Sequence, residues 1–138
     1  MSLFSKKREV GVQSFILKLV NNNCSELTAM MEGPRIDRRV NLTVVVAIVP
    51  VENKKTQIDQ AFTAVTKEFS NSGVALVLSE PRGLEYAILG FRFEGQMRFV
   101  RAQAKHLNPM GGGFYQIGFQ LLEMLSVADH PELQDVSY

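Results

Sequence analysis

The sequence predicts a mainly β fold, a small barrel of six antiparallel strands preceded by one helix. Six short segments rich in β-branched and aromatic residues follow one another at nearly regular spacing. Residues that favour turns separate these segments, and no long helical pattern interrupts them. Such a series favours a sheet closed into a barrel over a doubly wound α/β fold.

The helix is predicted from apolar residues near the N-terminus that recur at i, i+3, i+4, i+7 and i+8. They form one face of a helix: Val12, Phe15, Ile16, Leu19 and Val20. Three weak helix formers at 21–23 are expected to end it. Because an apolar face must be covered, we expect the helix either to pack on the barrel or to pair with another subunit as a homodimer.

The strands are predicted where apolar or alternating runs stop at Gly, Pro, Asn or acidic residues. In order they are 44–49, 62–69, 74–78, 86–93, 97–105 and 114–119, with a turn at 109–113. Residues 121–125 are compatible with a short closing helix or with an extension of the last strand. We therefore divide the chain into a helix and linker (1–33), a barrel domain (34–125) and a loosely ordered tail (126–138).

Composition excludes several classes of function. Fifteen basic and fourteen acidic residues leave a formal charge of +1, so an anionic partner must be held by a local cluster of cations. The single cysteine, Cys24, excludes an intramolecular disulfide and a cysteine-based metal cage, and a free thiol fits a reducing compartment. No apolar run is long enough to span a bilayer. These features predict a cytoplasmic protein.

Two short motifs carry the chemistry. The first is Arg35-Ile36-Asp37-Arg38-Arg39, in which Arg35 and Arg39 are four residues apart and lie on one side in a helix or a strand. Guanidinium groups bind phosphates through two parallel hydrogen bonds and stack on flat bases. Arg38 is a candidate accessory residue that raises the local charge. Alone, this stretch is equally compatible with a solvated basic turn.

The second motif is Glu68-Phe69-Ser70-Asn71-Ser72-Gly73. Glu68 and Ser70 are two residues apart and would share one face of a strand. A carboxylate can accept the adjacent N–H groups of a guanine edge, and the hydroxyl can bond a base or a phosphate. Gly73 would permit a tight turn through a positive φ. Alone, this stretch is also compatible with a surface hairpin.

Together, in this order and spacing, the two motifs resemble the signature of the PilZ domain, a bacterial receptor for cyclic di-GMP. The resemblance covers roughly residues 34 to 122 and includes 115–119, which are similar to the last strand of that family. It implies a six-stranded barrel in which Arg35 and Arg39 hold phosphates and stack on guanine. It also implies that Glu68 and Ser70 meet a base, while Gly73 keeps the turn open. Ligand binding would order the arginine segment across the barrel and relay the level of the second messenger to a protein partner.

One residue departs from the family pattern. Glu68 stands where the family usually has Asp or Asn, and its extra methylene lengthens the reach of the carboxylate by about one bond, enough to matter at a tightly built site. The alternative is a degenerate PilZ-like adaptor that binds protein partners without nucleotide.

Other functions are less well supported by the sequence. The two histidines, His106 and His130, lack a zinc-type spacing, no cofactor motif is present and no nucleophile elbow occurs, so we do not expect an enzyme. Residues 111–113 lack the Lys and Ser/Thr of a phosphate-binding loop and are expected to form a hairpin turn. Basic residues near Phe91, Phe93 and Phe99 raise the possibility of a nucleic-acid surface. Alternation and the near-neutral charge favour packing roles for these aromatics instead.

Overall fold

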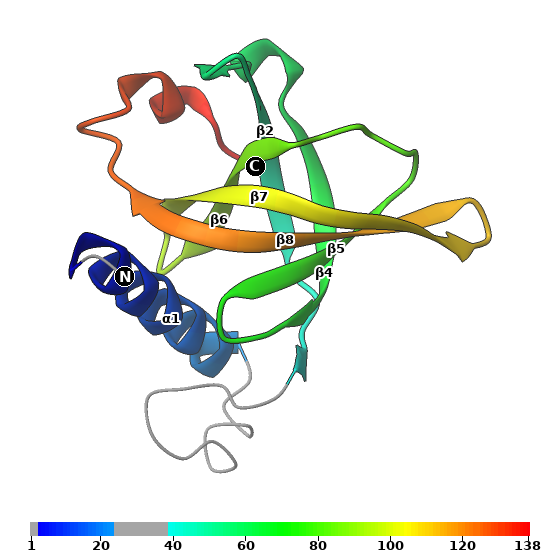
Figure 1. Ribbon diagram of the computed structural model, residues 1–138, viewed down its shortest axis with the longest axis horizontal. Helices are drawn as coiled ribbons and strands as arrows, with labels where there is room; N and C mark the ends of the chain where they lie inside the picture. The colour runs from blue at the N-terminus through cyan, green and yellow to red at the C-terminus, as the bar shows by residue number, and fades with distance from the viewer. Residues whose placement is uncertain (1–2, 24–38) are drawn as a thin grey trace.

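The computed structural model describes residues 3–23 and 39–138 and shows one helix beside an antiparallel sheet that closes in a ring (Figure 1). The mainly β fold class is therefore confirmed. The helix and strands are α1 (Leu3–Asn23), β1 (Val40–Asn41), β2 (Val45–Glu52), β3 (Lys55–Thr56), β4 (Phe62–Phe69), β5 (Gly73–Leu78), β6 (Tyr86–Phe93), β7 (Gln96–Gly111) and β8 (Phe114–Leu125). Two short 3₁₀ helices, η1 (Ile58–Gln60) and η2 (Pro131–Asp135), complete the described elements.

The ring closes because β2 pairs with strands on both of its sides. The strand order is β1-β4-β5-β8-β7-β6-β2-β3, and β2 also pairs with β4. The first half of β2 lies opposite β4, with Val45 beside Val65, while its second half lies opposite β6, with Val51 beside Tyr86. The six predicted strands form this ring. The two-residue strands β1 and β3 were not predicted, since neither has a run of strand-forming residues.

Helix α1 covers one end of the ring with the face predicted from the sequence. Val12, Phe15, Ile16, Leu19 and Val20 are all at most 8% exposed and belong to the main core. The ring of Phe15 lies 5.8 Å from that of Phe91 and 6.2 Å from that of Phe93, between centroids. The helix therefore packs on the barrel, the first of the two expected outcomes.

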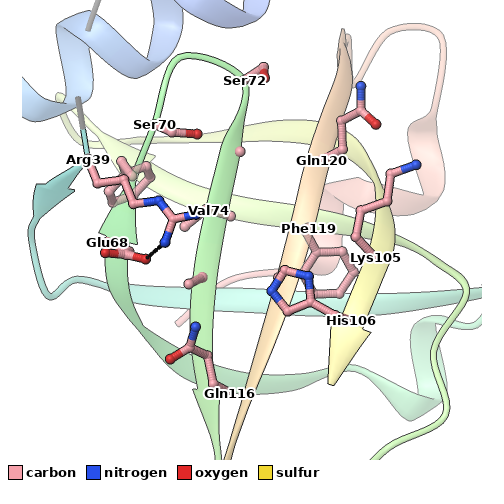
Figure 2. Close-up of a pocket in the computed structure, with 14 residues that line it drawn as sticks. Arg39, Glu68, Ser70, Ser72, Val74, Lys105, His106, Gln116, Phe119 and Gln120 are labelled. Carbon is pink, nitrogen blue, oxygen red and sulfur yellow. Dashed lines mark hydrogen bonds and ion pairs between the residues drawn. The ribbon is translucent and has the colours of Figure 1, made fainter. Parts of the chain in front are cut away.

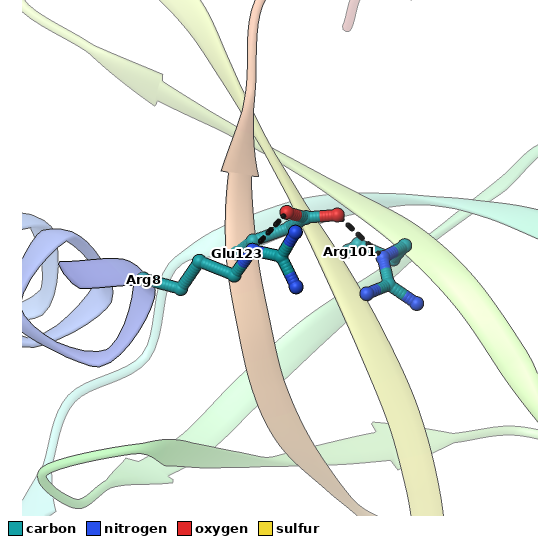
Figure 3. A network of polar contacts seen from close by, with 3 residues as sticks. All are labelled: Arg8, Arg101 and Glu123. Carbon is teal, nitrogen blue, oxygen red and sulfur yellow. Dashed lines mark hydrogen bonds and ion pairs between the residues drawn. The ribbon is translucent and has the colours of Figure 1, made fainter. Parts of the chain in front are cut away.

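A polar bridge fixes the position of the helix on the barrel (Figure 3). The Glu123 carboxylate on β8 bonds Arg101 Nε on β7 at 2.9 Å and Arg8 Nε on α1 at 3.1 Å. All three side chains are partly exposed, and such ion pairs each contribute at most about 1 kcal/mol. Apolar burial therefore contributes most to the docking of α1, and the bridge adds a polar contact between the helix and β7–β8.

Residues 121–125 extend β8, which is the second of the two alternatives that the sequence left open. The C-terminal tail differs from the sequence prediction. The stretch after β8 is not loose, because Leu133 and Val136 are buried at 0% and 7% exposure in a second apolar cluster with Val49 and Phe99. The cause is that β2, β6 and β7 carry apolar side chains on both faces. The C-terminal tail packs on the outer face of these strands and buries its apolar side chains.

Tyr138 adds a polar contact at the point where β2 leaves β6. Its hydroxyl accepts a hydrogen bond from the Arg92 N–H and donates one to the Val45 carbonyl, both at 2.8 Å. One side chain therefore satisfies backbone groups of two diverging strands.

Within the described residues, no helix is long and apolar enough to cross a membrane.

Substitution of Ile16 tests whether helix α1 is part of the folded core. Ile16 is fully buried, so Ile16→Ala should lower the free energy of unfolding by about 2–5 kcal/mol, measured by urea denaturation. Val10→Ala is the matched control on the same helix, since Val10 is 59% exposed, and it should leave stability unchanged or slightly higher. Equal effects of the two substitutions would contradict the docked helix.

Candidate functional site

The pairing of β1 with β4 brings Arg39, the last residue of the first motif, to the second motif. Val40 lies opposite Phe69 and Asn41 opposite Glu68, so Arg39 reaches β4 immediately before β1 begins. Arg39 Nη1 donates to Glu68 Oε1 at 3.0 Å. The Arg39 side chain is 73% exposed, whereas that of Glu68 is 17% exposed. The guanidinium therefore lies at the surface and contacts a largely buried carboxylate.

Thr66 holds this junction in place. It is the one polar residue among the buried side chains of the described chain, and its hydroxyl donates to the Leu42 carbonyl at 2.6 Å. The same oxygen accepts the Val44 N–H at 2.9 Å. These bonds satisfy backbone groups of the segment between β1 and β2, where no regular ladder runs. The path of the chain from Arg39 into the barrel is thereby attached to β4.

A β-bulge at Lys67 sets the direction of Glu68. Thr66 lies opposite Leu76 and Glu68 opposite Ala75, so Lys67 is an extra residue on β4. Thr66 and Phe69 both point into the core, and the bulge leaves Lys67 and Glu68 outside it. Without the bulge, Glu68 would share the inward face of Thr66. The carboxylate is available to a ligand because the strand is irregular at this point.

The motif residues line a single pocket of about 170 Å³ (Figure 2). Ser70 and Gly73 form its turn, closed by a 3.0 Å hydrogen bond from the Ser70 N–H to the Gly73 carbonyl. A 2.7 Å bond from the Leu121 N–H to the Ser72 carbonyl attaches this turn to β8. The predicted site residues that the structure brings together in the pocket are Arg39, Glu68, Ser70 and Gly73. Arg35, Arg38 and Cys24 lie outside the described residues.

Gly73 has a different role from the one predicted. It does not adopt a positive φ, so the turn does not require glycine for that reason. A Cβ at this position would instead lie 2.9 Å from the Phe119 carbonyl oxygen and 3.4 Å from Ser70 Oγ. Gly73 is required because β5 and β8 approach closely beside the pocket, and the prediction about its φ is wrong.

The opposite wall of the pocket contains residues that belong to neither sequence motif. Lys105 and His106 on β7 line it together with Gln116, Gly118 and Gln120 on β8. The strand predicted over 97–105 continues to Gly111, so His106 lies within β7. The turn is correspondingly shorter than predicted and contains glycines with positive φ. A run of alternating residues contains no sign of where a strand bulges, so these side chains could not be placed from sequence.

The aromatic residues considered for nucleic-acid binding are core residues. Phe91, Phe93 and Phe99 are 1%, 8% and 2% exposed. Phe91 packs on Phe15 and Phe69, and Phe99 lies under the C-terminal tail. They offer no exposed face for stacking on bases, which confirms the packing role predicted for them.

A solved structure with a similar fold is that of a Bacillus subtilis inhibitor of motility, MotI/DgrA. The TM-score is 0.50 at 15% sequence identity, over 75% of this chain and 48% of that chain. The present chain thus matches about half the length of that structure. This likeness supports a PilZ-like fold. No family model and no curated protein matches the sequence.

The role of Gly73 can be tested by adding one methyl group. Gly73→Ala should lower the free energy of unfolding by about 1–3 kcal/mol in urea denaturation, because the new Cβ meets backbone that cannot easily move. Gly83→Ala is the control. Its Cβ would meet nothing within 4 Å, so stability should stay the same or rise slightly. A Gly73→Ala protein as stable as wild type would contradict the close approach of β5 and β8.

Proposed function

We propose that this protein binds cyclic di-GMP in the pocket between the β4–β5 turn and the β7–β8 pair. The observation that carries the proposal is the 3.0 Å contact between Arg39 and Glu68, which are 29 residues apart in the chain. Ser70 and Gly73 line the same pocket. Arg39 of the first motif and three residues of the second therefore line one pocket, which supports the proposal drawn from the resemblance to the PilZ domain.

Each pocket residue suits part of a cyclic dinucleotide. The exposed Arg39 guanidinium can grip a phosphate with two parallel hydrogen bonds and stack on a purine. The Ser70 hydroxyl can donate to a phosphate or accept from a base, and the Glu68 carboxylate can accept N–H groups of guanine. In the unliganded protein Arg39 and Glu68 bond each other. An ion pair this exposed stabilises by at most about 1 kcal/mol, so a ligand can replace it at little cost.

The proposed output is a change in the surface offered to a protein partner. Arg39 is the last residue before β1, and Arg35 lies four residues earlier in the sequence. A ligand held by both arginines would connect the segment ahead of β1 to the face of the barrel. The role of Arg35 rests on the resemblance to PilZ, whereas that of Arg39 rests also on its position in the pocket.

A second candidate function is that of an adaptor that binds protein partners without nucleotide. One observation favours it: the longer Glu68 side chain already reaches Arg39, so both groups have a partner in the absence of ligand. In this case the ion pair would be a structural contact, and the pocket would remain without nucleotide.

Calorimetric titration with cyclic di-GMP tests the proposal. Wild-type protein should bind, and Arg39→Ala should weaken binding by about 10- to 100-fold, as expected for loss of a charged hydrogen bond. Ser70→Ala should weaken it by about 3- to 10-fold, since its bond is weaker. Binding should also weaken as salt is added, because the phosphate contacts are ionic.

The matched controls are Arg98→Ala and Ser79→Ala, which remove exposed residues outside the pocket and should leave affinity unchanged. Absence of binding by wild-type protein would contradict the proposal. If Glu68→Asp then restored binding, the longer side chain would be the cause, and the adaptor function would be favoured.

A further inference from the structure

We infer that Lys105 and His106 form a second ligand-binding wall, which faces Arg39 and Glu68 across the pocket and holds the other phosphate of a dinucleotide. This inference rests on the proposed function and adds to it residues that neither sequence motif contains. It is based on the irregularity of β7, on the packing of the imidazole against Gly118 and on the balance of charge in the pocket.

A second bulge turns both side chains toward the pocket. Ala104 lies opposite Phe119 and His106 opposite Gly118, so Lys105 is an extra residue on β7. In a regular strand, neighbouring side chains point to opposite faces. Here Lys105 and His106 both line the pocket, which a regular strand would not allow. The bulge thus supplies a cation and an imidazole side by side.

The imidazole of His106 occupies the space above Gly118. A Cβ on Gly118 would lie 2.6 Å from His106 Cε1 and 2.7 Å from Nε2, closer than real Cβ atoms approach. The ring can lie across β8 only because residue 118 has no side chain. In Figure 2 it lies on the β8 side of the pocket, while Arg39 enters from the β4 side. A ligand seated between these walls would contact both.

The charge of the pocket favours an anion. Among its described lining residues, Arg39 and Lys105 are cations and Glu68 is the sole carboxylate. Arg39 already neutralises Glu68, whereas Lys105 Nζ contacts only the neutral Gln103 side chain, at 3.3 Å and in an exposed position. Lys105 therefore carries an uncompensated charge at the wall opposite Arg39. In a protein of net charge +1, this local excess is what would attract a second phosphate.

Lys67 strengthens the same arrangement without belonging to either wall. Its Nζ donates to Gln116 Oε1 at 3.0 Å, from the bulge on β4 to the pocket side of β8. Gln116 lines the pocket, so this contact connects the bulge on β4 to the part of β8 that lies between the two walls.

The inference is tested by calorimetric titration of the full chain with cyclic di-GMP at several salt concentrations. Lys105→Gln should weaken binding by about 10-fold. It should also reduce the slope of log affinity against log salt concentration by the amount expected for loss of about one ionic contact. His106→Ala should weaken binding by about 3- to 10-fold. Gly118→Ala should weaken it to the same extent, because its methyl group displaces the imidazole, and it should have no further effect in a His106→Ala background.

The controls are Lys55→Gln on β3 and His130→Ala near η2, which lie outside the pocket and should leave affinity unchanged. Urea denaturation of each variant separates lost binding from lost folding. If wild-type protein binds and Arg39→Ala weakens it while Lys105→Gln and His106→Ala do not, the second wall is wrong and the proposed function stands. If wild-type protein does not bind, the proposed function fails and the second wall fails with it.

Discussion

The pairing of β4 with the chain segments that precede it is the constraint on which the rest of the structure depends. Pairing of β4 with β2 closes the barrel, and pairing with β1 brings Arg39 to Glu68. Thr66 joins these two ladders by bonding the backbone between them. Closure of the barrel and the position of Arg39 beside Glu68 therefore both depend on β4. A change that loosened this junction should lower stability and also disrupt the proposed ligand site.

The pocket is built from departures from regular sheet geometry. Bulges at Lys67 and Lys105 turn polar side chains out of the alternating pattern on two strands. Gly73 and Gly118 allow close approach, the first of β8 backbone and the second of an imidazole. The β7–β8 ladder has further irregularities at Arg101/Ala102 and Pro109/Gly111. The inner face of the ring is apolar and is covered by α1 at one end, while the C-terminal tail packs on the outer face. The apolar core supports the fold, and the bulges on β4 and β7 shape the pocket in which we propose that a ligand binds.

The apolar periodicity of the helix and the six strand-forming runs were sufficient to predict the fold. The apolar face from Val12 to Val20 was predicted residue by residue, and all six strands of the ring were found. The packed tail was missed, because Leu133 and Val136 lie in a short polar stretch without a period. Their burial depends on the outer face of distant strands, which local sequence does not reveal.

The site was predictable in part. The two motifs identified Arg39, Glu68 and Ser70, which the fold brings together. Lys105 and His106 were not identifiable, because a bulge is decided by the pairing of two whole strands. Gly73 lines the pocket, but the close approach of the Phe119 backbone, and not a positive φ, requires glycine there. The sequence therefore indicates that a glycine is needed at position 73 more readily than it indicates which contact requires the glycine.

The most direct test of the central claim is to map the ligand onto the protein by NMR, following backbone amide shifts during titration with cyclic di-GMP. The largest changes should occur in residues 68–74, 105–106 and 116–120, which surround the pocket. Amides of β3 and η2, on other parts of the surface, should be unaffected. Shifts concentrated outside the pocket, or no shifts at saturating ligand, would contradict the account.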